Sequence, residues 1–215
     1  MHRRHFVPWL SRNDELGVCQ HRAVTNEFRL ITPDPPLRHG SVTLRPFHIE
    51  DAAAVAEACR DSLIPRFTFM AEGLTEAAAR EWIERAQDHW HEGHARFAIV
   101  ATDSDLLLGQ VGMSVSWRRM SAEAFYWVVR DARGRRVAST ALGLLADWAF
   151  DVFGIERLSL FTHVENEASQ RVAKHCGFTK EGILRAYEPF KGTRPDLVSW
   201  SLLPADHRPW RGARG

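Results

Sequence analysis

Three consecutive β-type segments, a basic loop and one long apolar helix follow one another directly, and this order limits the fold more than any other feature. The segments are "RFAIVAT", "LLLGQVGMSVSW" and "AEAFYWVV", with the turn "DSD" between the first two. The loop "RDARGRR" then leads into a helix over residues 135–153 whose expected buried stripe consists of Val137, Ala141, Leu144, Leu145, Trp148 and Val152. Since such a helix has to bury its apolar face against a sheet, the order predicts a mixed α/β domain built around one sheet.

The segments on either side extend the same domain. Before it, "SVTLRPF" predicts a strand, Asp51 caps a helix that runs to about Cys59, and Thr75 caps a second helix in "LTEAAAREWIERAQDHW". After it come the strand "ERLSLFTHV", a short helix capped by Asn166 and ended by Gly177, and the strands "TKEGILRAYE" and "DLVSWSLL". Because "ITPDPPLRHG" is rich in residues that break regular structure, we expect an N-terminal extension over 1–40, one domain over 41–205 and a tail over 206–215.

Composition excludes several classes of partner. The 28 Lys+Arg and 27 Asp+Glu residues nearly cancel, so no overall field favours nucleic acid or a membrane surface. No apolar run approaches the roughly 18 residues of a membrane span. Cys19, Cys59 and Cys176 have no metal-ligand spacing and suit reduced thiols in a cytoplasmic protein. The histidines of "HWHEGH" share no helix face and no acid or cysteine completes a zinc set, so we expect no bound metal.

The basic loop is the strongest local signal for a ligand. Four arginines and one aspartate lie between Arg130 and Arg136, at the start of a helix whose first N–H groups attract anions. The loop lacks the Gly-Lys-Ser/Thr of a Walker cradle and the three glycines of a dinucleotide fingerprint. From spacing alone, a pyrophosphate site and a solvated basic helix start both remain open.

The motifs taken in order resemble the GNAT superfamily of acyl-CoA-dependent N-acyltransferases, and within it the ribosomal-protein-alanine N-acetyltransferase (RimJ/RimL-like) branch. The resemblance rests on "LRPF", "TEAAAREWI", "LLLGQVG", "ARGRRVASTAL", "NEASQRVAKHCGFTKEG" and "DLVSWSLLP", and covers about Val42 to Pro204. It implies a central, mostly antiparallel sheet that is splayed between its fourth and fifth strands and flanked by about four helices. The pantetheine arm of coenzyme A would lie in that gap.

The resemblance also implies acetyl-CoA as co-substrate and a pyrophosphate-binding motif at the loop. The first glycine of the family motif is replaced by Arg136, whose N–H survives if the residue keeps helical φ in the first helical turn, with its side chain turned outward. The residues expected beside the coenzyme are Val128, Val129, Arg133, Gly134, Arg135, Arg136, Val137, Ala138, Ser139, Asn166 and Ser169.

Three catalytic roles follow from the same resemblance. A backbone N–H near Tyr126 would stabilise the oxyanion, Ser169 would protonate the leaving thiol, and Glu188 would take the amine proton through water. Some relatives use a tyrosine four residues after the serine, where this chain has Ala173. The roles of Ser169 and Glu188 each have a plain structural alternative, since serine is common in a first helical turn and a carboxylate at a strand end is usually solvated.

The resulting hypothesis is an N-acetyltransferase that moves acetyl from acetyl-CoA to a primary amine by direct attack in a ternary complex. A protein or peptide α-amine is favoured as acceptor, because with a pKa of ~7.7–8.0 it is neutral in about a tenth of molecules at pH 7. The alternatives are a small-molecule amine as acceptor, or an inactive CoA-binding module, for which Arg136 is the argument. We expect a cytoplasmic monomer or homodimer with no direct nucleic-acid or membrane partner.

Overall fold

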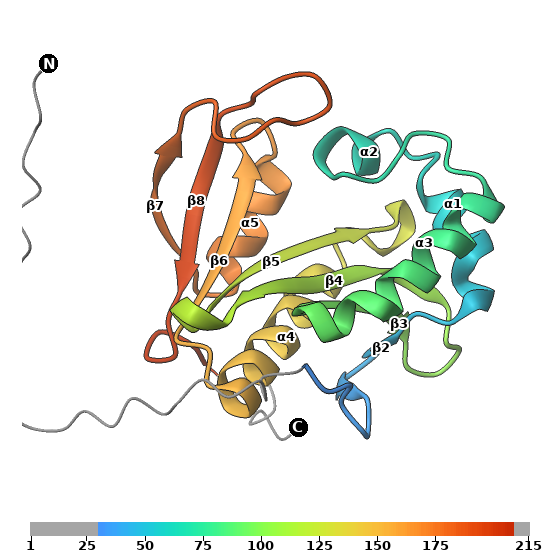
Figure 1. Ribbon diagram of the computed structural model, residues 1–215, viewed down its shortest axis with the longest axis horizontal. Coiled ribbons are helices and arrows are strands. Elements are labelled where there is room, and N and C mark those ends of the chain that lie inside the picture. Colours follow the sequence, from blue (N-terminus) through green and yellow to red (C-terminus); the bar gives the residue numbers. More distant parts are fainter. Residues whose placement is uncertain (1–29, 209–215) are drawn as a thin grey trace, which may run out of the picture.

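The computed structural model describes residues 30–208, which form a single eight-stranded sheet flanked by helices (Figure 1). The strand order across the sheet is β1-β2-β3-β4-β5-β6-β8-β7, and every neighbouring pair is antiparallel except β5 and β6. The strands are β1 Leu37–His39, β2 Val42–Pro46, β3 His94–Ala101, β4 Leu107–Ser116, β5 Ser121–Val128, β6 Arg157–His163, β7 Thr179–Leu184 and β8 Leu197–Leu202.

Five α-helices accompany the sheet in the described part of the chain: α1 Ala52–Ala58, α2 Leu63–Phe67, α3 Glu76–Asp88, α4 Val137–Phe153 and α5 Glu167–His175. Two of the predicted caps are confirmed, since Thr75 Oγ1 accepts from the Ala78 N–H at 3.2 Å and Asn166 Oδ1 accepts from the Ser169 N–H at 3.1 Å. Gly177, with φ of 83°, follows α5 as expected. No helix in residues 30–208 is long and apolar enough to cross a membrane.

The helices divide between the two faces of the sheet, and each face has its own core. On one face α4 packs on β2, β4 and β5, and its middle turns are buried nearly all round. On the other face α1 and α3 cover Ala98, Val100 and Trp127. Figure 1 shows α3 in front of β3 and β4, with α4 beyond and below them. The apolar stripe predicted for α4 is buried except for Val152, which is 56% exposed because it lies on the outer side of the last turn.

Three local features differ from the sequence-based expectations. The strand β1 lies within the segment assigned to an extension, where Leu37 is buried and pairs with Leu44 of β2. The helix α2 lies in a segment with no helical periodicity. The long helix begins at Val137 rather than at residue 135, because the backbone of Arg136 is left-handed. Counting β1, the predicted fourth and fifth strands are β5 and β6, and the structure confirms the mixed, mostly antiparallel sheet with its parallel pair there.

A buried ion-pair network fixes the start of the domain. The guanidinium of Arg45 binds Asp51 through two hydrogen bonds, of 2.7 and 3.0 Å, and Asp105 through two more, of 2.8 and 3.0 Å. The Asp51 carboxylate therefore does not cap its own helix by a side-chain bond, as the sequence suggested. It also accepts the His48 N–H at 2.8 Å. Through Arg45, the network joins β2, the start of α1 and the β3–β4 turn.

We predict that Asp51→Asn lowers the free energy of unfolding by about 3 kcal/mol, since it leaves a buried guanidinium with half of its charged partners. Urea unfolding followed by circular dichroism measures the change. Asp103→Asn, at an exposed position in the same β3–β4 turn, should change the free energy by no more than about 0.5 kcal/mol. Equal effects of the two substitutions would contradict the role of the network.

Candidate active site

The site begins where β5 and β6 stop pairing. The parallel ladder joins Ser121–Ala124 to residues 157–160 and then ends, although β5 continues to Val128 and β6 to His163. β6 instead stays paired with β8 as far as His163. Figure 1 shows the result: β6 and β8 turn upward while β5 continues across the molecule with β4. Within residues 30–208, one edge of β5 is therefore left without a neighbouring strand over its second half.

This unpaired edge presents backbone groups. Val129 donates its N–H to the Leu108 carbonyl at 2.9 Å, so this is a hydrogen-bonded pair in the β4–β5 ladder. Because such pairs alternate along an antiparallel ladder, the N–H groups of Tyr126 and Val128 point away from β4. Both lie beyond the last residue paired with β6. On the same edge, the Val128 carbonyl accepts from Arg133 Nε at 3.2 Å.

The basic loop does not have the conformation expected from the sequence. Arg136 was expected to keep helical φ in the first helical turn, but it has φ of 62° and ψ of 9° and lies at the N-cap, one residue before α4. The first helical hydrogen bond runs from the Thr140 N–H to the Arg136 carbonyl at 2.9 Å, so the amides at 137–139 have no helical acceptor. Together with Gly134, at φ of 73°, the loop contains two left-handed residues within three positions.

Two of the loop arginines are held by an aspartate from the other side of the sheet. The carboxylate of Asp61, between α1 and α2, forms an ion pair with Arg133 and lies 3.7 Å from Arg130. Burial opposes the charge of Asp61, but the Leu63 N–H and Arg133 outweigh it and lower the pKa of the carboxyl. Arg133 thus joins the loop to β5 and to the α1–α2 connection. Arg135 and Arg136 are exposed, and their charges remain free for an anion within the described chain.

Two hydroxyl groups meet on the α4 side of the divergence. Tyr126 Oη and Ser169 Oγ are 2.8 Å apart, which joins β5 to the first turn of α5. Burial raises the pKa of Tyr126 far more than the bond to Ser169 lowers it, so the phenol stays protonated. The position four residues after the serine is the buried Ala173, but a tyrosine hydroxyl reaches the serine from β5 instead. The buried Cys176, whose pKa burial raises to about 12, is a poor nucleophile.

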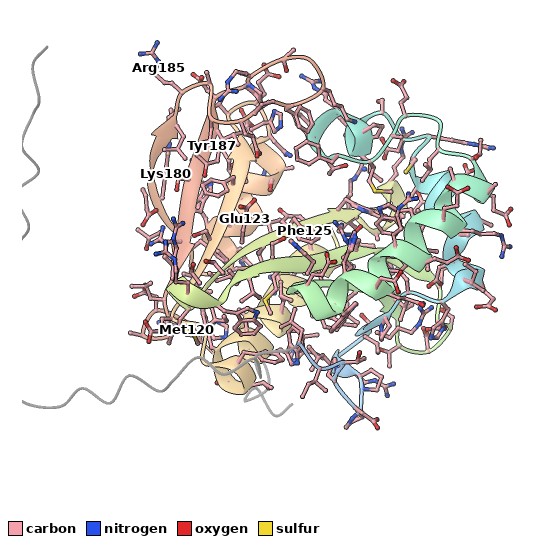
Figure 2. The ribbon with its side chains drawn as sticks, in the orientation of Figure 1. Met120, Glu123, Phe125, Lys180, Arg185 and Tyr187 are labelled. Carbon is pink, nitrogen blue, oxygen red and sulfur yellow. The ribbon has the colours of Figure 1, made fainter. Side chains whose placement is uncertain are left out.

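On the opposite face of β5, the carboxylate of Glu123 is influenced by the charge of Glu188. The Glu123 side chain is exposed to solvent, yet partial burial by the protein around its carboxyl raises the pKa of that group. The negative charge of Glu188, in the β7–β8 loop, raises that pKa further. Figure 2 shows Glu123 and Phe125 along β5, beside the strands that turn away. Glu188 was a candidate from the sequence and Glu123 was not, although one acid within the apolar segment "AEAFYWVV" is the signal that could have identified Glu123.

Two sets of contacts connect the half of the sheet that contains β6, β7 and β8 to the half that contains β5. Lys191 Nζ donates to the carbonyls of Pro65 and Met70, each at 2.6 Å, and so fastens the β7–β8 loop to α2 and the segment after it. Arg66 of α2 pairs with Glu165, which follows β6, at 2.7 Å. These contacts bridge the two diverging halves, and Figure 1 shows α2 and the β7–β8 loop approaching one another there.

Comparison with known proteins identifies the family to which the chain belongs. Residues 41–179 match the family model described as the acetyltransferase (GNAT) domain. The chain belongs to the GNAT family of acetyltransferases. It is 29% identical to the protein named "Uncharacterized N-acetyltransferase p20" of Bacillus licheniformis, over 77% of this chain and 94% of that relative.

Solved structures of similar fold include Mycobacterium smegmatis RimJ in complex with CoA-disulfide. Its TM-score is 0.70 at 23% identity, and the match covers 77% of this chain and 83% of that chain. Ribosomal-protein-S5-alanine acetyltransferase from Vibrio fischeri has a TM-score of 0.69 at 19% identity, covering 81% and 99% of the two chains.

The acetyltransferase therefore uses acetyl-CoA, which supplies a thioester whose carbonyl carbon an amine can attack. The residues fit the coenzyme. Amides without helical acceptors and the exposed guanidinium groups of Arg135 and Arg136 lie at the start of α4, where a pyrophosphate would be bound. The free N–H groups on the edge of β5 suit the amides of an extended arm. Gly134 adds to the fit, because no atom lies within 4 Å of where its side chain would begin.

We predict that Arg136→Gly raises the free energy of unfolding by about 1 kcal/mol, because it relieves a left-handed residue of its Cβ. Affinity for CoA, measured by calorimetry, should stay within about tenfold, or ~1.4 kcal/mol, since the backbone amide is unchanged. A larger loss of affinity would show that the guanidinium itself binds phosphate.

The matched substitution Gly134→Ala should act in the opposite direction. It places a Cβ on a left-handed residue of the same loop and should lower the free energy of unfolding by about 1 kcal/mol. If both substitutions changed stability in the same direction, the backbone of this loop would not be the cause.

Proposed function

We propose that the acetyltransferase acetylates the α-amine of a protein or peptide, by direct attack of the amine on the thioester in a ternary complex. The observation that carries the proposal is the separation of two proton-transfer groups by β5: carboxylates on one face and paired hydroxyls on the other. An amine that approaches from the carboxylate face would meet the thioester at the edge of β5, with the departing sulfur on the hydroxyl face.

Glu123 and Glu188 are proposed to receive the amine proton through water. An α-amine has a pKa of ~7.7–8.0, so a base with a moderately raised pKa suffices, whereas a lysine amine at ~10.4 is protonated far more completely at pH 7. Two carboxylates close enough to affect each other give one group whose pKa is raised. This matches the modest demand that an α-amine makes on its base.

Ser169 and Tyr126 are proposed to return a proton to the thiolate that leaves. The hydroxyl of Ser169 is within hydrogen-bond distance of Tyr126, and the Asn166 cap fixes the backbone of its helical turn. The Ser169 hydroxyl would give its proton to the departing sulfur and take one from Tyr126. The resulting phenolate, whose pKa burial raises, would then recover a proton from water. The Tyr126 N–H, on the unpaired edge, is proposed to bind the carbonyl oxygen as negative charge develops on it.

The structural neighbours support a protein acceptor, because two of them are RimJ and a ribosomal-protein-S5-alanine acetyltransferase by their names. A small-molecule amine is the alternative acceptor. The third hypothesis, an inactive CoA-binding module, depended on Arg136 as a defect in the loop. In the structure, Arg136 is an exposed, left-handed residue at the N-cap of α4, and this conformation supports a functional loop rather than a defective one.

A turnover screen tests the proposed function. Free thiol released from acetyl-CoA is measured with peptides that differ in their first residue and, in parallel, with a polyamine and an aminoglycoside. Acetylation at the peptide N-terminus, located by mass spectrometry, is the expected result. Turnover of the small amines alone would overturn the proposed acceptor.

The pH profile of kcat/KM tests the carboxylate pair. Because the charge of Glu188 raises the pKa of Glu123, Glu188→Gln should move the acidic limb of the profile to lower pH. Glu123→Gln should remove that limb and lower kcat/KM by about 10²-fold or more. Glu84→Gln, exposed on α3, is the control and should leave the profile unchanged. Loss of the limb in Glu188→Gln alone would make Glu188 the sole base.

Substitution of the hydroxyl pair tests proton donation. Ser169→Ala should lower kcat by about 10²-fold, while Tyr126→Phe should lower it less, because Ser169 keeps its own hydroxyl. Affinity for CoA, measured by calorimetry, should change little in either variant. An unchanged kcat in Ser169→Ala would remove the pair from the mechanism.

A further inference from the structure

Arg96 of β3 lies on the carboxylate face of the sheet, against aromatic rings. Its guanidinium carbon is 5.0 Å from the centroid of the Phe125 ring and 5.7 Å from that of Trp82. Arg96, Gly112 and Phe125 are directly opposite one another on β3, β4 and β5. A Cβ on Gly112 would lie 2.6 Å from the Phe125 ring, so the missing side chain lets the ring lie over β4 and reach Arg96.

No carboxylate of the described chain pairs with Arg96, which distinguishes it from the other arginines. In residues 30–208, every other arginine either forms an ion pair with an acid or is exposed to solvent. Arg96 is only partly accessible, and its close partners in the described part of the chain are the rings of Trp82 and Phe125. Its nitrogen atoms are nevertheless not fully buried. Among the described residues, the fully buried polar side-chain atoms without a hydrogen-bond partner belong to Asp61 and His207, and none belongs to Arg96.

The charge on Arg96 is therefore incompletely compensated. Burial lowers the pKa of Arg96, and its positive charge contributes to the lowered pKa of the neighbouring His94, after burial of that imidazole. The aromatic rings offset part of the lost hydration of the guanidinium, but rings do not satisfy its N–H donors. A protein that keeps such a group beside a ligand site usually does so because the ligand supplies the anion.

The position of Arg96 relates it to the proposed acceptor. Phe125, on which it stacks, is the first residue of β5 beyond the ladder with β6. Glu123, two residues earlier, points to the same face of the sheet, because side chains alternate along a strand. Glu123 and Arg96 form no ion pair with each other. Opposite charges thus lie on one face without neutralising each other, as a ligand with an amine and a carboxylate would require.

We propose that Arg96 binds a carboxylate of the acceptor, so that the enzyme prefers amines that also carry an acidic group. For a peptide acceptor, which rests on the proposed function, this is an acidic side chain near the N-terminus. The planar guanidinium can donate two parallel hydrogen bonds to a carboxylate, while the stacked Phe125 ring keeps its plane oriented. The uncharged amide of Asn or Gln has the same shape but would gain much less.

Matched acceptor pairs test the proposal. Peptides Ala-Asp-Phe and Ala-Asn-Phe, with amidated C-termini, are compared by kcat/KM, together with 6-aminohexanoate and its amide. The wild-type enzyme should prefer the acid member of a pair by about tenfold or more, the size expected of a charge-assisted contact. Arg96→Gln should remove this preference while leaving turnover of the uncharged member nearly unchanged, and Arg96→Lys should retain part of it.

Two further measurements separate specificity from stability. Arg185→Gln removes an exposed arginine at the periphery of the β7–β8 region and should leave the preference intact (Figure 2). Thermal unfolding of Arg96→Gln should match or exceed that of the wild type, since a buried charge without an ion pair is removed. A loss of turnover that is equal for acidic and uncharged acceptors would overturn the proposal and assign Arg96 a packing role.

The outcomes for the acceptor class and for Arg96 are independent. Peptides acetylated without any preference for the acid would overturn the carboxylate site and leave the proposed function standing. Preference for 6-aminohexanoate over its amide, without turnover of any peptide, would support the carboxylate site and overturn the peptide acceptor. Absence of turnover with every pair would overturn both.

Discussion

The early end of the β5–β6 ladder is the constraint on which the site depends. Four residue pairs hold the two halves of the sheet together, and beyond them β6 follows β8 while β5 follows β4. Backbone N–H groups of β5 that a continuous sheet would satisfy internally find no partner among the described residues. A buried N–H group without a hydrogen-bond partner raises the free energy of the folded protein. A ligand that binds here as an additional strand would supply the missing acceptors. The bridges from Lys191 and Arg66 limit how far the two halves can separate.

The period of two along β5 divides the chemistry between the faces of the sheet. Glu123 and Phe125 face α3, whereas Tyr126 faces α4 and reaches Ser169 of α5. A carboxylate and a hydroxyl on the same face of one short strand could form a hydrogen bond with each other. In the proposed function, their placement on opposite faces lets one group accept and the other donate a proton on the two sides of one carbonyl group, without contact between them. The backbone between them contributes the N–H that the same carbonyl would approach.

Much of this arrangement was predictable from local patterns, and the failures have identifiable causes. Thr75 and Asn166 cap α3 and α5 as expected, because a cap depends on the residues next to it. The strand β1 and the helix α2 were missed, since short elements owe their conformation to packing and carry little periodicity of their own. The left-handed backbone of Arg136 was also missed, because arginine rarely adopts that conformation without tertiary support. Glu123 was missed for another reason: its raised pKa depends on burial and on Glu188, which is distant in sequence.

The electrostatics of the site depend on contacts that no short motif contains. Asp61 forms an ion pair with Arg133, whereas Arg135 and Arg136 are exposed. The positive charge available to a phosphate is therefore smaller than the number of arginines in the loop suggests. On the other face, Arg96 keeps its charge among aromatic rings because Gly112 removes the side chain that would separate them. In both places a residue elsewhere in the chain decides whether an arginine is already neutralised or still lacks an anion. The arginines that matter for a ligand are those that the fold has left uncompensated, and these can be identified only once the partners of all the others are known.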